Sequence, residues 1–174
     1  MLINNTVSSY HIPTLCPQWM FPEETPEVIA MGWRERAIPL ARGGNIRGFF
    51  SRGPGKASIE FESLLEYRVA QALSEVDESC EIISQPLTIH YTSGDKVYKY
   101  TPDFLVRFGC LPASLAARGF ERLTLIECKP AAKLDACAAN LARAYRALRQ
   151  VTSTPLLVVT NERLHPVSWG RDHD

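Results

Sequence analysis

The sequence has no net charge, no apolar run of membrane-spanning length, and none of the common nucleotide or nucleophile motifs. Lys and Arg together number 19, as do Asp and Glu, which argues against a protein that coats nucleic acid non-specifically. No apolar run approaches the roughly 20 residues of a membrane helix, and the N-terminus lacks the pattern of a secretory signal. A Walker-type loop and a GxSxG elbow are also missing, so nucleotide hydrolysis and acyl transfer have no support.

Neither the cysteines nor the histidines of the sequence show the spacing of a zinc site. The five cysteines include no CxxC pair and their number is odd, so we expect reduced thiols in a cytoplasmic protein. The four histidines form no recognisable set, and we expect them to be structural or exposed: His11, His90, His165 and His173.

The composition is that of an ordinary globular protein, with 174 residues of which 45% are hydrophobic and 22% charged. One domain is expected. Residues 1–47 are predicted to be an irregular N-terminal arm because prolines break any period, residues 48–162 to be the folded domain, and residues 163–174 to be a tail. The arm could pack on its own domain or dock on a partner subunit.

Residues 33–56 carry six basic side chains and one acid, interleaved with glycines and aromatics. Arginine and the backbone N–H groups of a Gly-rich loop suit phosphate contacts, and aromatic rings can stack on bases. A solvated basic loop is the alternative. The segment predicts DNA contacts by Arg34, Arg36, Arg42, Arg47, Arg52 and Lys56.

Hydrophobic periodicity beyond this segment predicts six main elements. They are a helix over 63–76, strands over 80–91, 96–108, 123–129 and 155–160, and a helix over 134–150. A turn over 92–95 joins the first two strands as a hairpin. The order of helix, hairpin pair, strand, helix and strand favours a mixed sheet flanked by helices, and hence an α/β fold.

Two of these strands carry charges where more Val or Ile is expected. Asp103 lies in one, and Glu127 and Lys129 share a face of the other. Burying a charge without a partner costs several kcal/mol. Mg²⁺ prefers hard oxygen ligands, which Asp103, Glu127 and the backbone carbonyl of Cys128 could supply. Lys129 could orient or deprotonate a water, or neutralise developing charge.

Each of these charges also has an ordinary structural interpretation. Asp103 could be a turn or edge acid, and Glu127 with Lys129 a same-face ion pair. Glu66, on the flank of the apolar stripe of the first helix, points at the edge of the core. It could equally complete a capping box with Ser63 as the N-cap.

The pattern Pro-Asp followed by Glu-x-Lys, preceded by an acid on a helix, resembles the PD-(D/E)XK nucleases. A longer and more specific match resembles TnsA, the endonuclease subunit of heteromeric cut-and-paste transposases. This resemblance covers about Gly48 to Thr160. It is carried by Gly48–Ser51, Phe61–Glu66, Gln85–Ile89, Tyr100–Val106 and Leu125–Pro130.

The resemblance implies a restriction-endonuclease-like αβββαβ core over residues 48–162, with a mixed sheet flanked by helices. It implies a catalytic set of Glu66, Asp103, Glu127 and Lys129, in which the three acids serve the metal. The position of Glu127 tolerates other acceptor residues in the family. The implied cofactor is Mg²⁺, with Mn²⁺ able to substitute.

The implied reaction is cleavage of the 5′ strands of double-stranded DNA at transposon ends, in a prokaryotic protein that is nucleoid-associated when active. A DDE transposase subunit, TnsB, cuts and joins the 3′ strands. Longer family members contact an ATPase regulator, TnsC, through a C-terminal winged-helix domain. Only 45 residues follow Lys129, so we expect that domain to be absent, and an ATPase regulator stays a doubtful partner because this binding domain is missing.

Two other functions remain open from the sequence. One is a stand-alone PD-(D/E)XK nuclease of resolvase or restriction type, and the other is a non-catalytic DNA-binding or assembly module. The set of two strand acids with a lysine argues against the second. The neutral total charge favours DNA selection by a partner.

Overall fold

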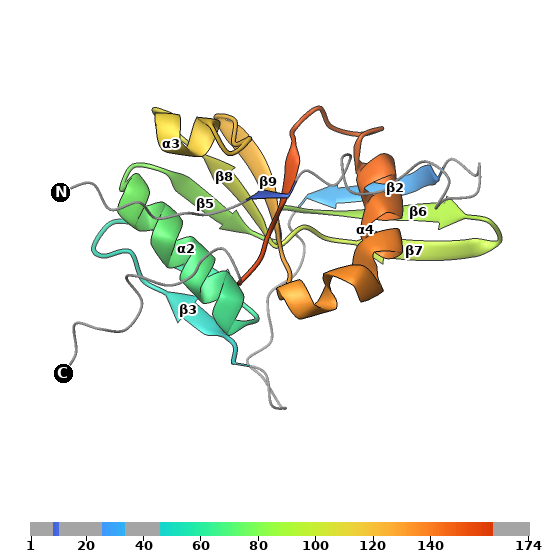
Figure 1. Cartoon of the computed structure of the whole chain (residues 1–174), viewed down its shortest axis with the longest axis horizontal. Helices are drawn as coiled ribbons and strands as arrows, with labels where there is room; N and C mark the ends of the chain where they lie inside the picture. Colours follow the sequence, from blue (N-terminus) through green and yellow to red (C-terminus); the bar gives the residue numbers. More distant parts are fainter. Residues whose placement is uncertain (1–8, 11–25, 34–45, 162–174) are drawn as a thin grey trace.

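The computed structural model describes residues 9–10, 26–33 and 46–161. Figure 1 shows their arrangement. The strands are β1 Ser9–Tyr10, β2 Glu27–Trp33, β3 Gly48–Phe50, β4 Ile59–Phe61, β5 Glu81–Ser84, β6 Leu87–Ser93, β7 Lys96–Tyr100, β8 Phe104–Arg107, β9 Leu123–Cys128 and β10 Leu156–Val159. The helices are α2 Leu64–Val76, α3 Ala113–Ala116 and α4 Leu134–Leu148, with the 3₁₀ turn η2 Ala131–Lys133 before α4.

The strands form three sheets. The largest has five strands in the order β1-β10-β9-β8-β5, in which β9 and β10 are parallel and the other pairs antiparallel. The second is antiparallel in the order β2-β6-β7, and β3 and β4 pair separately. The expectation of a mixed α/β fold is therefore confirmed at this coarse level.

The two long helices cover different parts of this framework. Helix α2 contacts β3, β4 and β9, whereas α4 contacts β2 and β6. Figure 1 shows α2 beside β3, and α4 across β2 and β6. Within the part of the chain that the structure describes, no helix is both long and apolar enough to cross a membrane.

Strands β9 and β10 supply side chains to two hydrophobic cores. Ile126 and Leu157 belong to the cluster around α2. Leu125, Leu156 and Val158 belong to the cluster around α4. Successive side chains of a strand point to opposite faces, so this parallel pair is buried on both sides, as parallel strands usually are. The alternation predicted for the 123–129 strand is confirmed, and β9 is the middle strand of its sheet.

The predicted hairpin differs from the observed one, because each of its two long strands is broken. The 80–91 strand divides into β5 and β6 at Gln85 and Pro86, and the 96–108 strand into β7 and β8 at Thr101–Asp103. Strands β5 and β8 join the large sheet, whereas β6 and β7 join the small one. Proline has no N–H for a ladder, and Gln85 has a φ of 46°. The N–H of Gln85 donates to the Asp103 carbonyl at 2.8 Å, which ties the two breaks together.

The prediction of an irregular arm is wrong for two segments. Residues 27–33 form β2, an edge strand paired with β6, and residues 9–10 pair with β10. Strand β2 has no simple alternation of apolar residues, and its register shifts between Val28 and Ala30. Its pairing with β6 therefore creates a strand that its own pattern does not predict. The rest of the predicted arm before residue 46, and residues 162–174 of the tail, lie outside the described residues.

Neighbouring leucines on β10 test the two cores separately. Leu156 and Leu157 are both fully buried, each in a different cluster. Leu156→Ala and Leu157→Ala should each lower the free energy of unfolding by about 2–5 kcal/mol, because each leaves a cavity. Val97→Ala, at a residue that is 62% exposed, should change it by less than about 0.5 kcal/mol. Urea denaturation measures all three, and a neutral Leu157→Ala would contradict the α2 core.

Candidate active site

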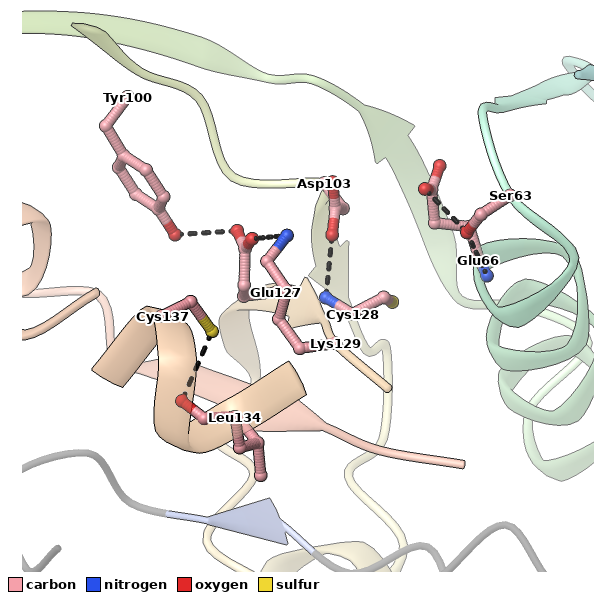
Figure 2. A network of polar contacts seen from close by, with 9 residues as sticks. All are labelled: Ser63, Glu66, Tyr100, Asp103, Glu127, Cys128, Lys129, Leu134 and Cys137. Atoms are coloured by element: carbon pink, nitrogen blue, oxygen red, sulfur yellow. Dashed lines mark hydrogen bonds and ion pairs between the residues drawn. The ribbon is translucent and has the colours of Figure 1, made fainter. Parts of the chain in front are cut away.

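Figure 2 shows three acidic side chains and one lysine in one region: Asp103, Glu127 and Lys129 lie together, and Glu66 lies beside them on a neighbouring helix. Asp103 immediately precedes β8, Glu127 lies in β9, and Lys129 follows β9 directly. Because β8 pairs with β9 with Phe104 opposite Ile126, Asp103 comes to the level of Glu127. Glu66 lies in the first turn of α2, near enough for its charge to raise the pKa of Asp103. The four residues of the predicted catalytic set therefore come from three separate elements.

Asp103 is fixed to the end of β9 by a short hydrogen bond. The backbone N–H of Cys128 donates to Asp103 Oδ2 at 2.6 Å. Burial raises the pKa of Asp103 well above its usual range, and repulsion from Glu127 and then Glu66 raises it further; Lys129 and the Cys128 N–H act in the opposite direction. The pKa of Asp103 is therefore shifted by Glu66, Glu127 and Lys129 together.

Glu127 and Lys129 form the ion pair that the sequence left as an alternative. Lys129 Nζ lies 2.5 Å from Glu127 Oε1, and the Glu127 side chain is only 4% exposed. Burial alone would lower the pKa of Lys129, but attraction to Glu127 and Asp103 raises it above its usual value. The ammonium therefore keeps its proton near neutral pH. A buried carboxylate without such a partner would be strongly destabilising.

Tyr100 supplies the second contact of Glu127. Its hydroxyl donates to Glu127 Oε2 at 2.8 Å. Burial, followed by the neighbouring Glu127 charge, raises the pKa of Tyr100 well above its usual value, so the phenol remains a donor. Reasoning from the sequence assigned no role to Tyr100. One signal was present, because a partly buried tyrosine next to an acidic strand end needs a hydrogen-bond partner.

Glu66 takes part in the cap of α2. Its N–H donates to Ser63 Oγ at 3.2 Å, and the Ser63 hydroxyl donates to Glu66 Oε1 at 2.8 Å. The carboxylate also accepts from the N–H of Glu62 at 2.7 Å, one residue before the N–H that a standard capping box uses. Burial raises the pKa of Glu66, whereas the hydrogen bonds and Lys129 lower it. Glu66 is therefore both a cap residue and a member of the charged group.

The chemistry of these donors fits a hard divalent cation, but their present contacts compete with one. Three acidic side chains face a single ammonium, and the raised pKa values of Asp103 and Glu66 reflect the cost of ionising all three together. As the side chains stand, no three Asp, Glu, His or Cys residues of the described segments are arranged around a metal position. A cation would compete with the cap for Glu66 and with Lys129 for Glu127. The carboxylates of Glu66, Asp103 and Glu127 are the groups that could hold it, and the Cys128 carbonyl remains a predicted ligand.

The basic residues predicted to contact DNA divide into two groups. Arg34, Arg36 and Arg42 lie outside the described residues. Arg47 lies 3.8 Å from Glu62. Arg52 donates to the carbonyls of Glu78 and Cys80, and Lys56 donates to the carbonyl of Glu78 at 2.9 Å. The last two cations therefore fasten the β3–β4 loop to the turn after α2, and DNA contact by these residues stays a prediction.

Gln85 is a second residue near the group that the sequence did not single out. Its positive φ is unusual for a side chain of this size, and its N–H holds the backbone of Asp103. Residues in sparsely populated backbone regions often cluster at functional sites. The proline that follows Gln85 was the only local signal of the break.

Comparisons of the chain with protein-family models, with curated proteins and with solved structures find no match.

The raised pKa of Asp103 gives a test of the charged group that requires no activity. Its folded-state pKa lies above the unfolded value of about 3.9. Protonation of Asp103 therefore favours the folded state. This contribution to stability is fully present below the unfolded pKa and is lost as the pH rises through the folded pKa. Asp103→Asn removes the charge while keeping an acceptor for the Cys128 N–H. It should raise the thermal midpoint in EDTA near neutral pH, and the gain should shrink as the pH is lowered toward about 4. A lower midpoint at neutral pH would contradict the electrostatic description.

Proposed function

We propose that this chain is a Mg²⁺-dependent endodeoxyribonuclease of the PD-(D/E)XK type with a restriction-endonuclease-like core. We further propose that it is a TnsA-like subunit that cleaves the 5′ strands at transposon ends beside a DDE transposase. The observation that carries the nuclease proposal is that Asp103 is hydrogen-bonded to the end of β9, which bears the Glu127–Lys129 ion pair, with Glu66 near enough for its charge to raise the pKa of Asp103. The transposition part rests on the sequence motifs.

The order of elements is compatible with the proposed core. Helix α2 is followed by a bent hairpin, the central strand β9, helix α4 and the parallel strand β10. The hairpin supplies Asp103 at its bend, and β9 supplies Glu127 and Lys129 at its end. Asp103 lies where the chain leaves β7 of the three-stranded sheet and enters β8 of the five-stranded sheet.

The residues of the group have distinct proposed roles. Glu66, Asp103, Glu127 and the Cys128 carbonyl would hold the Mg²⁺. When bound, this ion stabilises charge on the phosphate and lowers the pKa of an attacking water. Because Lys129 keeps its proton, it acts as a donor that orients the water or neutralises charge on the phosphate. The Cys128 N–H keeps Asp103 directed at the group.

The central test replaces Asp103, the acid whose pKa is shifted by the other three members of the group. Asp103→Asn should abolish Mg²⁺-dependent cleavage of the 5′ strand while the protein remains folded, since one charged ligand is lost. The assay mixes the chain with a candidate DDE transposase from the same genome and with DNA that carries the ends this transposase recognises, and denaturing gels report the cut. Asp95→Asn, at an exposed turn residue, is the matched control and should cleave like the wild type.

The outcomes separate the alternatives. Unchanged cleavage by Asp103→Asn would refute the site. Nicking of plasmid DNA by the wild type alone, with no dependence on a transposase, would favour a stand-alone nuclease. No cleavage under either condition would favour a non-catalytic DNA-binding or assembly module.

The two roles of Glu66 can also be separated. Ser63→Ala removes the cap and should cost about 1 kcal/mol of stability while largely preserving cleavage. Glu66→Gln keeps a side-chain oxygen for the Glu62 N–H and a donor for Ser63, so it should preserve most of the stability but remove cleavage. Urea denaturation and the strand-cleavage assay measure the two effects. Full cleavage by Glu66→Gln would restrict this residue to the cap.

A further inference from the structure

Each oxygen of the Glu127 carboxylate has a different partner. Oε1 lies 2.5 Å from Lys129 Nζ, and Oε2 accepts the Tyr100 hydroxyl at 2.8 Å. Figure 2 shows Tyr100 and Lys129 reaching this carboxylate together. With both oxygens engaged, the carboxylate cannot rotate about its last bond without losing a contact. Its orientation is therefore set by two side chains from different elements.

The Tyr100 contact links two sheets that share no strand. Tyr100 is the last residue of β7 in the three-stranded sheet, and Glu127 belongs to β9 in the five-stranded one. Three residues after Tyr100 the chain reaches Asp103, which is bonded to the residue after Glu127. Both ends of the segment from Tyr100 to Asp103 are therefore hydrogen-bonded to β9, one to Glu127 and the other to Cys128.

The Lys129 contact differs from the Tyr100 contact in one respect. A divalent cation at the group would compete with the Lys129 ammonium for Glu127, because both are attracted by the same charge. The Tyr100 phenol is neutral, so a cation does not displace it by charge repulsion or by competition for the negative charge. When the ammonium moves away, Tyr100 is the contact that still fixes the Glu127 carboxylate.

We infer that Tyr100 is a positioning residue, whose hydroxyl holds the Glu127 carboxylate in the orientation that a divalent cation requires. This inference rests on the proposed nuclease function. It assigns to the chain a supporting residue outside the set of acids and lysine. Outer partners that orient metal ligands in this way typically contribute about 10–100-fold to metal affinity or activity.

Tyr98 provides a matched control for the loss of one phenolic oxygen. It lies two residues earlier on β7 and so on the same face of the strand. Its contacts are made by the ring, which stacks on Tyr91 with centroids 5.5 Å apart and lies 5.1 Å from the Arg143 guanidinium. Tyr98→Phe therefore makes the same chemical change without affecting Glu127.

The experiment measures Mn²⁺ binding to the full chain without DNA, by the loss of the free-ion electron paramagnetic resonance signal. Tyr100→Phe should weaken Mn²⁺ binding about 10-fold or more relative to the wild type, and Tyr98→Phe should match the wild type. The Mn²⁺ concentration for half-maximal cleavage should shift in parallel. Thermal unfolding in EDTA establishes that Tyr100→Phe is folded.

A double-mutant cycle tests whether Tyr100 acts through Glu127. Glu127→Gln should weaken Mn²⁺ binding, and adding Tyr100→Phe to it should produce little further loss. The same fold-change in both backgrounds would overturn the positioning role, because a general structural effect would persist without the carboxylate.

The two proposals fail in different ways. If the wild type binds Mn²⁺ and cleaves DNA but Tyr100→Phe is indistinguishable from it, the role of Tyr100 is refuted and the nuclease proposal stands. If the wild type neither binds Mn²⁺ nor cleaves DNA, the nuclease proposal is refuted and the positioning role with it.

Discussion

The crowding of three acidic side chains around the single ammonium of Lys129 is the constraint on which the rest of this region depends. Like charges in a poorly solvated place repel strongly, and Asp103 carries that cost because burial and two neighbouring acids oppose its ionisation. A fold selected for stability alone would place apolar residues here. Sites that keep such charges generally sacrifice stability for function, which is the physical reason for proposing a function for this group.

The backbone is arranged to bring these charges together. Pro86 and Pro102 lie at the breaks in the two strands of the hairpin, and the hydrogen bond from the Gln85 N–H to the Asp103 carbonyl holds the breaks side by side. Beyond the break, β8 pairs with β9 and aligns Asp103 with Glu127. The bend is thus the feature that takes Asp103 out of a regular strand and directs it to the end of β9.

The structural and functional interpretations of these residues are compatible. The cap contacts of Glu66 and the ion pair of Glu127 are present, and both satisfy carboxylates that would otherwise be buried without partners. In the proposed function the same side chains exchange some of these contacts for a cation. Hydrogen bonds to Tyr100 and to the Cys128 N–H do not compete with a cation through charge, so they can maintain the geometry throughout.

Much of the local structure was predictable because it depends on short-range patterns. The alternation of β9 and the periodicity of α4 report which side of each element is buried, and the N-cap Ser63 marks where α2 begins; each was confirmed. The alternation also placed Glu127 and Lys129 on one face. These properties follow from the fixed periods of strands and helices.

The convergence of the site was decided by tertiary structure. Strand β2 exists through its pairing with β6, and the break of the hairpin sends its halves to different sheets. The bond from Tyr100 to Glu127 spans 27 residues of sequence. Contacts of this kind depend on where separate elements meet, which no local period encodes. The sequence by itself determined which residues carry the charges and on which face they lie; the packing of α2, the bent hairpin and β9 decided that they meet.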